Sequence, residues 1–336
     1  MRYLLIFLSF LILSGCGTKR QNFEPISLLG EIDYDGNLNS FIADVTIDGS
    51  TLKSGQIITK SGLIDVKIPK KYTFLGHWEE KYLASSKCSN LIIIDKNSKV
   101  LYEKKFDFIV ASASLRDDML AVVLGNNKVL LIDTKSDKIL YEKSGDKVYA
   151  HDSKLATPYF LNSLLIFPTL DGKLLIVDLK KNKLLKDIVI KSERFFSNVI
   201  YLNIFKDRMV AATKQRVVSI NSNSIAFLDE EIKDVIILED RVLVFTKDGR
   251  VVLADADLKV LKSEKFKFAT FAATNYKDSI YIIERGGYLI VADLNLTKSH
   301  VYALPEKIES LVFVTKDKLF YKDSYLEFSK LGKRYK

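Results

Sequence analysis

The chain has 336 residues, of which 48% are hydrophobic and 28% charged, and it carries a formal net charge of +9 at pH 7. The excess of lysine is spread along the chain beside Asp, Glu or Asn in turn-like segments. This pattern indicates an ordinary solvated surface and argues against nucleic acid as a partner. No Pro/Gly/Ser-rich linker divides the sequence, so we expect one large domain.

The N-terminus has the pattern of a secretion signal. Arg2 gives a positive start, and residues 3–13 (YLLIFLSFLIL) form an uninterrupted apolar run. A transmembrane helix needs roughly 20 apolar residues, so this shorter run is expected to be a signal peptide that is removed. One alternative to the lipoprotein signal described next is an ordinary signal peptide that Cys16 follows only by chance.

The next four residues, Leu13, Ser14, Gly15 and Cys16, resemble the lipobox of bacterial lipoproteins. The resemblance implies cleavage before Cys16, which then carries diacylglyceryl and palmitate chains that anchor the protein to a membrane. We expect a signal peptide over 1–15, a lipidated N-terminus and tether over 16–25, and a folded domain over 26–336. Because residue 17 is Gly rather than Asp, the resemblance favours the outer membrane, with the domain facing the periplasm.

One further cysteine, Cys88, is present. If Cys16 carries lipid, Cys88 has no intramolecular partner, and no disulfide is expected. Cys88 lies beside a strand-like run and is expected to be a small packed or turn-flanking side chain rather than a nucleophile.

A repeated unit runs through the rest of the chain. Each copy has an apolar run, a turn pair, a second apolar run that ends in Asp, a polar corner and a third apolar run. Four copies keep the second turn residue six positions before the Asp; their turn pairs are Asn126-Asn127, Asp171-Gly172, Asp248-Gly249 and Gly286-Gly287. Such pairs accept the positive φ angles of tight hairpin turns. With weaker copies included, the corners are Asp95, Asp133, Asp178, Asn221, Asp255, Asp293 and Asp323.

Spacings of 30 to 45 residues between corners, with four short strands per unit, are typical of a β-propeller. The third strand of each unit, such as VLLID, is apolar on both faces, as expected of a strand packed between two blades. A β-sandwich or a simple barrel would explain the strands but not the fixed turn register. We therefore predict an all-β propeller of four-stranded blades. The count is eight if residues 37–69 form a blade, and seven if they only complete the last one.

A lipobox followed by such a propeller resembles the BamB-like family of outer-membrane assembly lipoproteins and, more broadly, the quinoprotein-like (PQQ) repeat propellers. VLLIDTKSDKILYEK, over 129–143, keeps the family's apolar-Asp step and its Lys, while Thr-Gly is missing and Tyr stands where Trp is typical. The resemblance implies a non-catalytic scaffold that binds the machinery for outer-membrane β-barrel assembly.

The sequence offers little for catalysis. His77, His151 and His300 occur in dissimilar contexts without metal-ligand spacing, and no P-loop, Gly-x-Ser-x-Gly or Rossmann glycine pattern is present. His77 and His151 follow predicted first strands and could approach a central channel, although loop or core positions are the simpler interpretation. The corner Asp residues are expected to accept hydrogen bonds from their own turns. We predict no catalytic residue, no metal and no cofactor.

Three functions remain compatible with these features. The leading hypothesis is a scaffold that binds protein partners, because propeller rims offer wide rigid surfaces. An enzyme or small-ligand sensor that uses the central channel is the second. A surface-exposed, adhesin-like lipoprotein that binds host or matrix molecules is the third.

Overall fold

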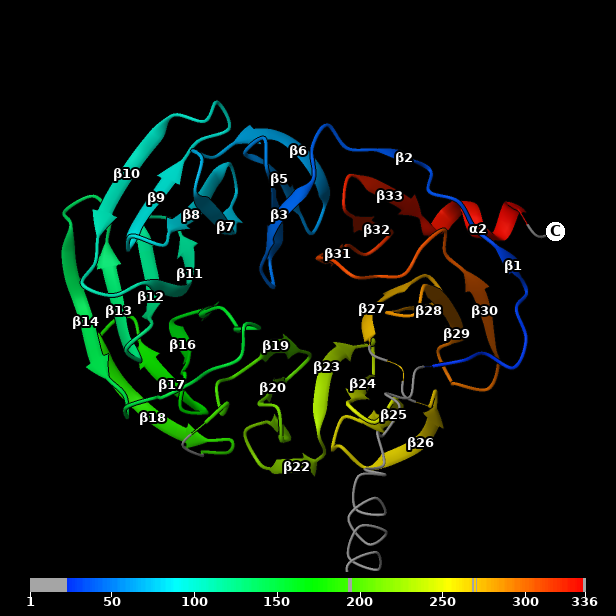
Figure 1. The fold of residues 1–336 in the computed structure, drawn as a ribbon. Helices are drawn as coiled ribbons and strands as arrows, with labels where there is room; N and C mark the ends of the chain where they lie inside the picture. Colours follow the sequence, from blue (N-terminus) through cyan, green and yellow to red (C-terminus); the bar gives the residue numbers. More distant parts are fainter. Residues whose placement is uncertain (1–22, 193–194, 268, 270, 335–336) are drawn as a thin grey trace, which may run out of the picture.

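The computed structural model describes residues 23–334 except 193–194, 268 and 270, and these residues form a ring of eight β-sheets (Figure 1). Each sheet is one blade, so the all-β propeller is confirmed and the blade count is eight rather than seven. The predicted signal peptide and lipobox lie outside the described residues. Within the described ranges, no helix is long and apolar enough to cross a membrane.

Six blades are formed from four consecutive antiparallel strands. Blade 1 contains β3 (Ile42–Val45), β4 (Gly49–Leu52), β5 (Gln56–Thr59) and β6 (Gly62–Lys67). Blade 2 contains β7 (Tyr72–Trp78), β8 (Lys81–Ser86), β9 (Asn90–Ile94) and β10 (Val100–Lys105). Blade 3 contains β11 (Val110–Arg116), β12 (Met119–Leu124), β13 (Lys128–Asp133) and β14 (Lys138–Ser144). Blade 4 contains β15 (Tyr159–Leu161), β16 (Leu164–Pro168), β17 (Lys173–Asp178) and β18 (Lys183–Val189). Blade 5 contains β19 (Tyr201–Phe205), β20 (Arg208–Ala212), β21 (Arg216–Ile220) and β22 (Ile225–Asp229). Blade 6 contains β23 (Ile232–Ile237), β24 (Arg241–Thr246), β25 (Arg250–Asp255) and β26 (Val260–Lys265).

The last two blades each include a strand from the N-terminal end of the described chain. Blade 7 contains β27 (Phe271–Tyr276), β28 (Ser279–Glu284), β29 (Tyr288–Asp293) and β30 (Ser299–Ala303), with β1 (Gly30–Glu31) parallel to β30 as a fifth strand. Blade 8 contains β31 (Val312–Val314), β32 (Lys318–Tyr321), β33 (Ser324–Glu327) and β2 (Gly36–Asn37) as its outer strand. The helix α2 (Phe328–Arg334) follows β33.

Strand burial follows strand position within each blade. The central residues of the third strand β13 are all buried. The central residues of the third strands β9 and β25, and of second strands such as β12, are also buried. The outer strand β22 alternates between exposed and half-buried side chains, because only one of its faces meets protein. The prediction that third strands are apolar on both faces is therefore confirmed.

The core is divided among the interfaces between blades. In the described parts of the chain, eight hydrophobic clusters each join two neighbouring blades, and one of them joins blade 8 to blade 1. In that closing cluster, Phe320 packs against Leu52 and Ile58, and all three are 2% exposed or less. Burying a side chain of this size contributes about 1.5–3 kcal/mol, so the closure of the ring is itself a core.

A clasp between segments near the two ends of the described chain closes the ring. β2 pairs antiparallel with β33 (Figure 1), and Glu327 N donates to the Asp35 carboxylate at 2.7 Å. The Asp35 side chain is only 3% exposed, and it also pairs with Lys330 at 3.5 Å. Phe328 of α2 stacks on Tyr281 with ring centroids 4.2 Å apart. The clasp thus covers the outer edge of blade 8.

The ring has two different faces. Turns between second and third strands bond to the connections between blades, so both lie on one face, called here the connection face. Ile190 N, for example, donates to Gly172 O at 2.9 Å, and Phe266 N donates to Gly249 O at 2.8 Å. The opposite face carries the corners between third and fourth strands.

One predicted corner is wrong. Asp323 lies in the turn between β32 and β33, and its carbonyl accepts from Leu38 N at 2.6 Å. Gly172 and Gly249 accept from the corresponding connections in blades 4 and 6, so Asp323 is a tip residue of the connection face. The sequence pattern places Asp323 after a third strand, whereas it follows β32, the second strand of blade 8. The difference arises because blade 8 takes its fourth strand from the N-terminal end instead of from the residues that follow β33.

Candidate protein-binding surface

The predicted lipid-attachment site at Cys16, with Leu13, Ser14 and Gly15, lies outside the described residues and stays a prediction. Within the segment 16–25 expected to be a tether, Phe23 is buried and packs edge-on against Phe266 and Tyr288, with ring centroids 6.3 and 5.7 Å apart. Phe23, within this segment, is therefore part of the folded core. Cys88 lies exposed in the turn between β8 and β9, as a free thiol.

The corner residues cap their own turns. The Asp255 carboxylate accepts from the Asp257 and Lys259 amides at 2.9 Å each, and Asn221 accepts from Asn223 and Ser224. Equivalent bonds occur at Asp95, Asp133, Asp178 and Asp293. These residues have a structural role, and the carboxylates are not brought together into a cluster.

The three histidines are also dispersed. His77 is on the innermost strand of blade 2, donates from Nδ1 to Glu79 O at 3.2 Å, and lines a cavity of about 210 Å³ with Ser114 and Thr157. His151 lies in the connection that follows blade 3, and His300 lies on the outer strand of blade 7. Among the residues that the structure describes, no group of three or more His, Cys, Asp or Glu is placed to hold a metal ion.

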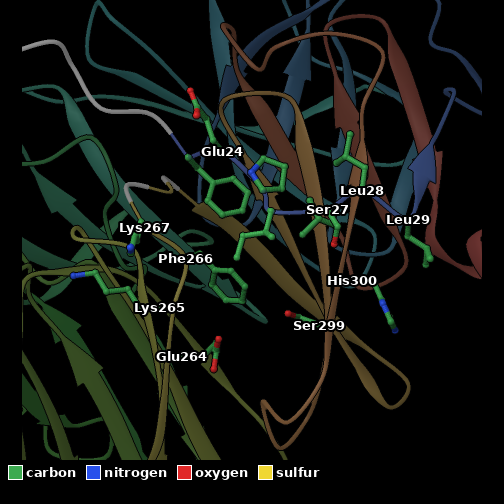
Figure 2. A pocket seen from close by; sticks show the side chains of 14 residues that line it. Glu24, Ser27, Leu28, Leu29, Glu264, Lys265, Phe266, Lys267, Ser299 and His300 are labelled. Atoms are coloured by element: carbon green, nitrogen blue, oxygen red, sulfur yellow. The ribbon is translucent and has the colours of Figure 1, made fainter.

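A second cavity of about 470 Å³ lies at the rim between blades 6 and 7 (Figure 2). It opens between Phe266, the outer strand of blade 7 and the segment 23–29. Both cavities have acidic, histidine and hydroxyl side chains among their lining residues: Asp48, His77 and Ser114 line the first, and Glu264, His300 and Ser299 line the second.

Two long connections on the connection face form the most distinctive surface. Residues 145–158 join blade 3 to blade 4, and residues 190–200 join blade 4 to blade 5. The two connections run side by side: Phe196 N donates to Ala150 O at 2.9 Å, and Ala156 N donates to Val199 O at 3.0 Å. The first connection turns inward toward the middle of the ring (Figure 1).

Two buried asparagines brace these connections. Asn198 is fully buried, accepts from Asp152 N at 2.6 Å and donates to Lys154 O at 2.9 Å. Asn127, also fully buried, accepts from Leu170 N at 2.8 Å and donates to Asp146 O at 2.9 Å. Because each amide replaces hydrogen bonds that water would otherwise supply, the connections are held in one arrangement.

Three aromatic side chains project from this braced pair. Tyr149, Phe195 and Phe196 are 63%, 55% and 49% exposed. The rings of Tyr149 and Phe195 are 5.9 Å apart, and Lys147 Nζ lies 5.2 Å above the Tyr149 ring. Phe196 has φ +54°, a backbone region that residues with side chains rarely adopt. Such a conformation persists only where surrounding contacts enforce it, and here it turns a large ring outward.

A charged network lies beside the aromatic cluster. Lys154 pairs with Asp234 of β23, and Lys214 pairs with Asp152. Lys214 Nζ also lies 5.5 Å above the Phe196 ring, which joins the network to the cluster. The two carboxylates are only 18% and 20% exposed, so these ion pairs are screened less by water than ordinary surface pairs.

The network shifts the ionisation of its members. Burial opposes the charged form of Asp152, but hydrogen bonds from Lys214 and the Lys154 amide outweigh it and hold its pKa below the usual range. Burial lowers the pKa of Lys233, Lys214 and Lys154 lower it further, and Asp152 partly restores it. The network therefore favours the ionised form of Asp152 and links the first connection to β23 through the Lys154–Asp234 pair.

Sequence reasoning missed this surface. The apolar stretch 195–205 (FFSNVIYLNIF) has the sequence pattern of a first strand, but the strand β19 covers only Tyr201–Phe205. The available signal was the length of the two connections, since other blades are joined by shorter ones. Exposed aromatic rings on a rigid support, ringed by lysine, are typical of protein-binding hot spots.

No family model matches the chain. The plasminogen-binding protein PgbB from two strains of Helicobacter pylori is 27% identical over 387 and 384 aligned positions, which cover 97% of this chain and 71% of those proteins.

Among solved structures, BamB from Moraxella catarrhalis superposes with a TM-score of 0.67 at 12% identity, covering 87% of this chain and 98% of that one. The C-terminal WD40 domain of Sif2 gives a TM-score of 0.66 at 10% identity, covering 90% of this chain and 99% of that one. The chain is an eight-bladed β-propeller with structural similarity to BamB. At these identities the likeness concerns the fold alone.

Proposed function

We propose that this protein is a non-catalytic, lipid-anchored propeller of the cell envelope that binds a host protein, with plasminogen as the first candidate. The observation that carries the proposal is the exposed aromatic pair Tyr149 and Phe195 on braced connections. The partner class comes from the relatives, because two proteins that align with nearly the whole chain are named for plasminogen binding.

The surface suits a protein partner better than a small ligand. It is built from side chains that are about half or more exposed, whereas small-molecule sites enclose most of the ligand. Tyr149 and Phe195 supply large contact area with few rotatable bonds, and Lys147 adds a positive charge beside them.

The test is binding of purified plasminogen to the purified full-length protein, measured by surface plasmon resonance. The double change Tyr149→Ala and Phe195→Ala should weaken binding about tenfold or more, since loss of a hot-spot ring costs about 2 kcal/mol. Phe41→Ala is the matched control, because Phe41 is 46% exposed, lies beneath Lys53 at 5.4 Å and directly precedes β3 of blade 1. Absence of plasminogen binding, or equal loss in all variants, refutes the proposal.

A second candidate is a role in outer-membrane β-barrel assembly, which the predicted lipobox and the BamB-like fold favour. The two functions need opposite orientations of the anchored domain. Host-protein binding requires the domain on the cell surface, where external protease reaches it in intact cells. Assembly requires it in the periplasm, and there the barrel-assembly pore should copurify with the protein and be lost in the same aromatic double variant.

A further inference from the structure

The segment 23–29 forms a short strap across the rim between blades 6 and 7. Phe23 fixes one end in the core that joins these blades, and β1 fixes the other end by pairing with β30. Leu29 N donates to Val301 O at 2.8 Å, which continues the pairing outward. The backbone of the strap is therefore held at both ends.

The strap presents its aliphatic side chains to solvent. Ile26 is fully exposed, at 106%, and Leu28 and Leu29 are 48% and 50% exposed. Behind them lies the cavity of about 470 Å³, with Phe266 on its inner wall (Figure 2). Three aliphatic residues within four positions, each about half or more exposed, form an apolar surface that water solvates poorly.

The charges around the strap nearly balance. Lys265 and Lys267 lie with Glu24 and Glu264 among the residues that line the cavity. Lys265 is also paired with Asp248 at 3.2 Å. Attraction to the surface is therefore expected to depend on the aliphatic side chains and only weakly on salt.

The length of the chain before the strap limits where it can lie. Seven positions separate Cys16 from Phe23. At about 3.5 Å per residue, a fully extended link spans roughly 25 Å. If Cys16 is held in a bilayer, the strap begins within that distance of the lipid headgroups. The high local concentration makes even a weak contact persist.

We propose that the strap is a membrane-apposed surface, with Ile26, Leu28 and Leu29 inserted among the lipid headgroups beside the anchor. This contact sets the ring on its rim at blades 6 and 7. The aromatic cluster of Tyr149 and Phe195 belongs to the connections around blade 4 and stays clear of the bilayer. The inference is independent of which protein the aromatic cluster binds.

The first measurement uses the full-length lipidated protein in vesicles of phosphatidylethanolamine and phosphatidylglycerol. A nitroxide is attached at Ile26→Cys in a Cys88→Ser background, and its collision with oxygen and with a water-soluble nickel complex is recorded. The label is expected to be shielded from nickel and accessible to oxygen. Leu185→Cys is the matched control, because Leu185 is 55% exposed on β18 in blade 4, and it should remain accessible to nickel.

The second measurement does not depend on lipidation. The described residues close the ring by themselves, so a chain of residues 17–336 keeps every described contact. Its cosedimentation with the same vesicles should fall about tenfold or more in the double variant Ile26→Glu and Leu28→Glu. Leu185→Glu with Val189→Glu should leave it unchanged.

Two results overturn the inference. One is nickel accessibility at position 26 equal to that at position 185, together with vesicle binding that the strap substitutions do not alter. The other is a label at position 26 that is exposed on vesicles and becomes shielded only when plasminogen is added, which would make the strap a protein-binding surface. Loss of plasminogen binding in the aromatic variants with unchanged labelling at position 26 concerns the proposed function alone.

Discussion

Substitution of the turn glycines is the most direct test of how the blades are built. Gly172, Gly249 and Gly287 are second-to-third-strand tips with φ of +81°, +86° and +94°, as the spacing predicted. A β-branched residue in this region costs about 1–3 kcal/mol in backbone strain. The three tips also pack against the connections between blades, and the space available for an added side chain differs from site to site.

The surroundings of each glycine rank the expected losses. A Cβ at Gly172 would overlap Lys191 O and lie 2.7 Å from Ser197 O, and one at Gly249 would overlap Phe266 O. At Gly287 the nearest atom, Glu306 O, is 2.8 Å away. Gly62 has φ +115°, but a Cβ there would have no neighbouring atom within 4 Å. A substitution at Gly62 therefore measures backbone strain without a steric collision. Overpacking adds about 1–3 kcal/mol, and backbone atoms yield less than side chains.

The assay is thermal and urea unfolding of the Val variants at the four glycines. We expect Gly172→Val and Gly249→Val to lose about 2–6 kcal/mol, Gly287→Val somewhat less, and Gly62→Val only the strain of about 1–3 kcal/mol. At an unfolding entropy of about 2.1 cal/mol/K per residue, each kcal/mol lowers Tm by about 1.5 °C in a domain of roughly 310 residues. Equal losses at Gly62 and Gly172 would show that the connections do not press on the tips, and parental stability at all four would refute the turn geometry.

Asn127 shows how one blade avoids this conflict. It occupies the position equivalent to Gly172 and Gly249, with φ +65°. The connection residue opposite is Gly145, whose N donates to Asn127 O at 2.9 Å. A Cβ at Gly145 would overlap the Asn127 amide. At the tip of blade 4, the connection leaves no room for a side chain. At the tip of blade 3, the glycine in the connection leaves room for the side chain of Asn127.

The remaining predictions concern the anchor, the free thiol, the corners and the clasp. Cys16→Ala should abolish incorporation of a fatty-acid analogue in metabolic labelling, and label retained on the variant would contradict lipidation there. Cys88→Ser should leave mobility on non-reducing gels unchanged, because the exposed thiol has no partner in the described chain; a reductant-dependent shift of the parent would contradict this. Burial raises the pKa of Asp293, but bonds from the Thr297 hydroxyl and turn amides outweigh it and lower it to about 2. Its stabilisation is therefore complete above the unfolded pKa of about 4 and is lost as pH falls toward 2. Asp293→Asn, which imitates Asn221, should keep neutral-pH stability and reduce the acid sensitivity of urea unfolding, whereas Asp293→Ala should cost about 1 kcal/mol; equal behaviour of the two would exclude the capping role. Asp35→Ala removes the carboxylate that accepts from Glu327 N and should cost about 1.5–3 kcal/mol in urea unfolding, against no change for the exposed Asp107→Ala.

Much of the blade architecture is predictable from local pattern. Tip pairs such as Asp248-Gly249 and corners such as Asp255 use interactions within a few residues, so each copy shows its geometry in its own letters. The apolar third strands follow from burial on both faces. The eighth blade was harder, because its outer strand β2 comes from residues 36–37, nearly the whole chain length away from β33. No local pattern encodes that pairing. For this reason, the prediction that Asp323 is a corner between a third and a fourth strand was wrong.

The sequence by itself determined that this chain repeats a four-stranded unit, turns at fixed positions and carries a lipobox-like N-terminus. Those features depend on residue type and short spacing. Only the tertiary structure decided the number of blades, the clasp, the exposure of Tyr149 and Phe195 side by side, and the outward-facing strap at Ile26. An apolar residue looks the same in sequence whether it is buried or exposed. The difference arises when distant connections pair and leave particular side chains without neighbours.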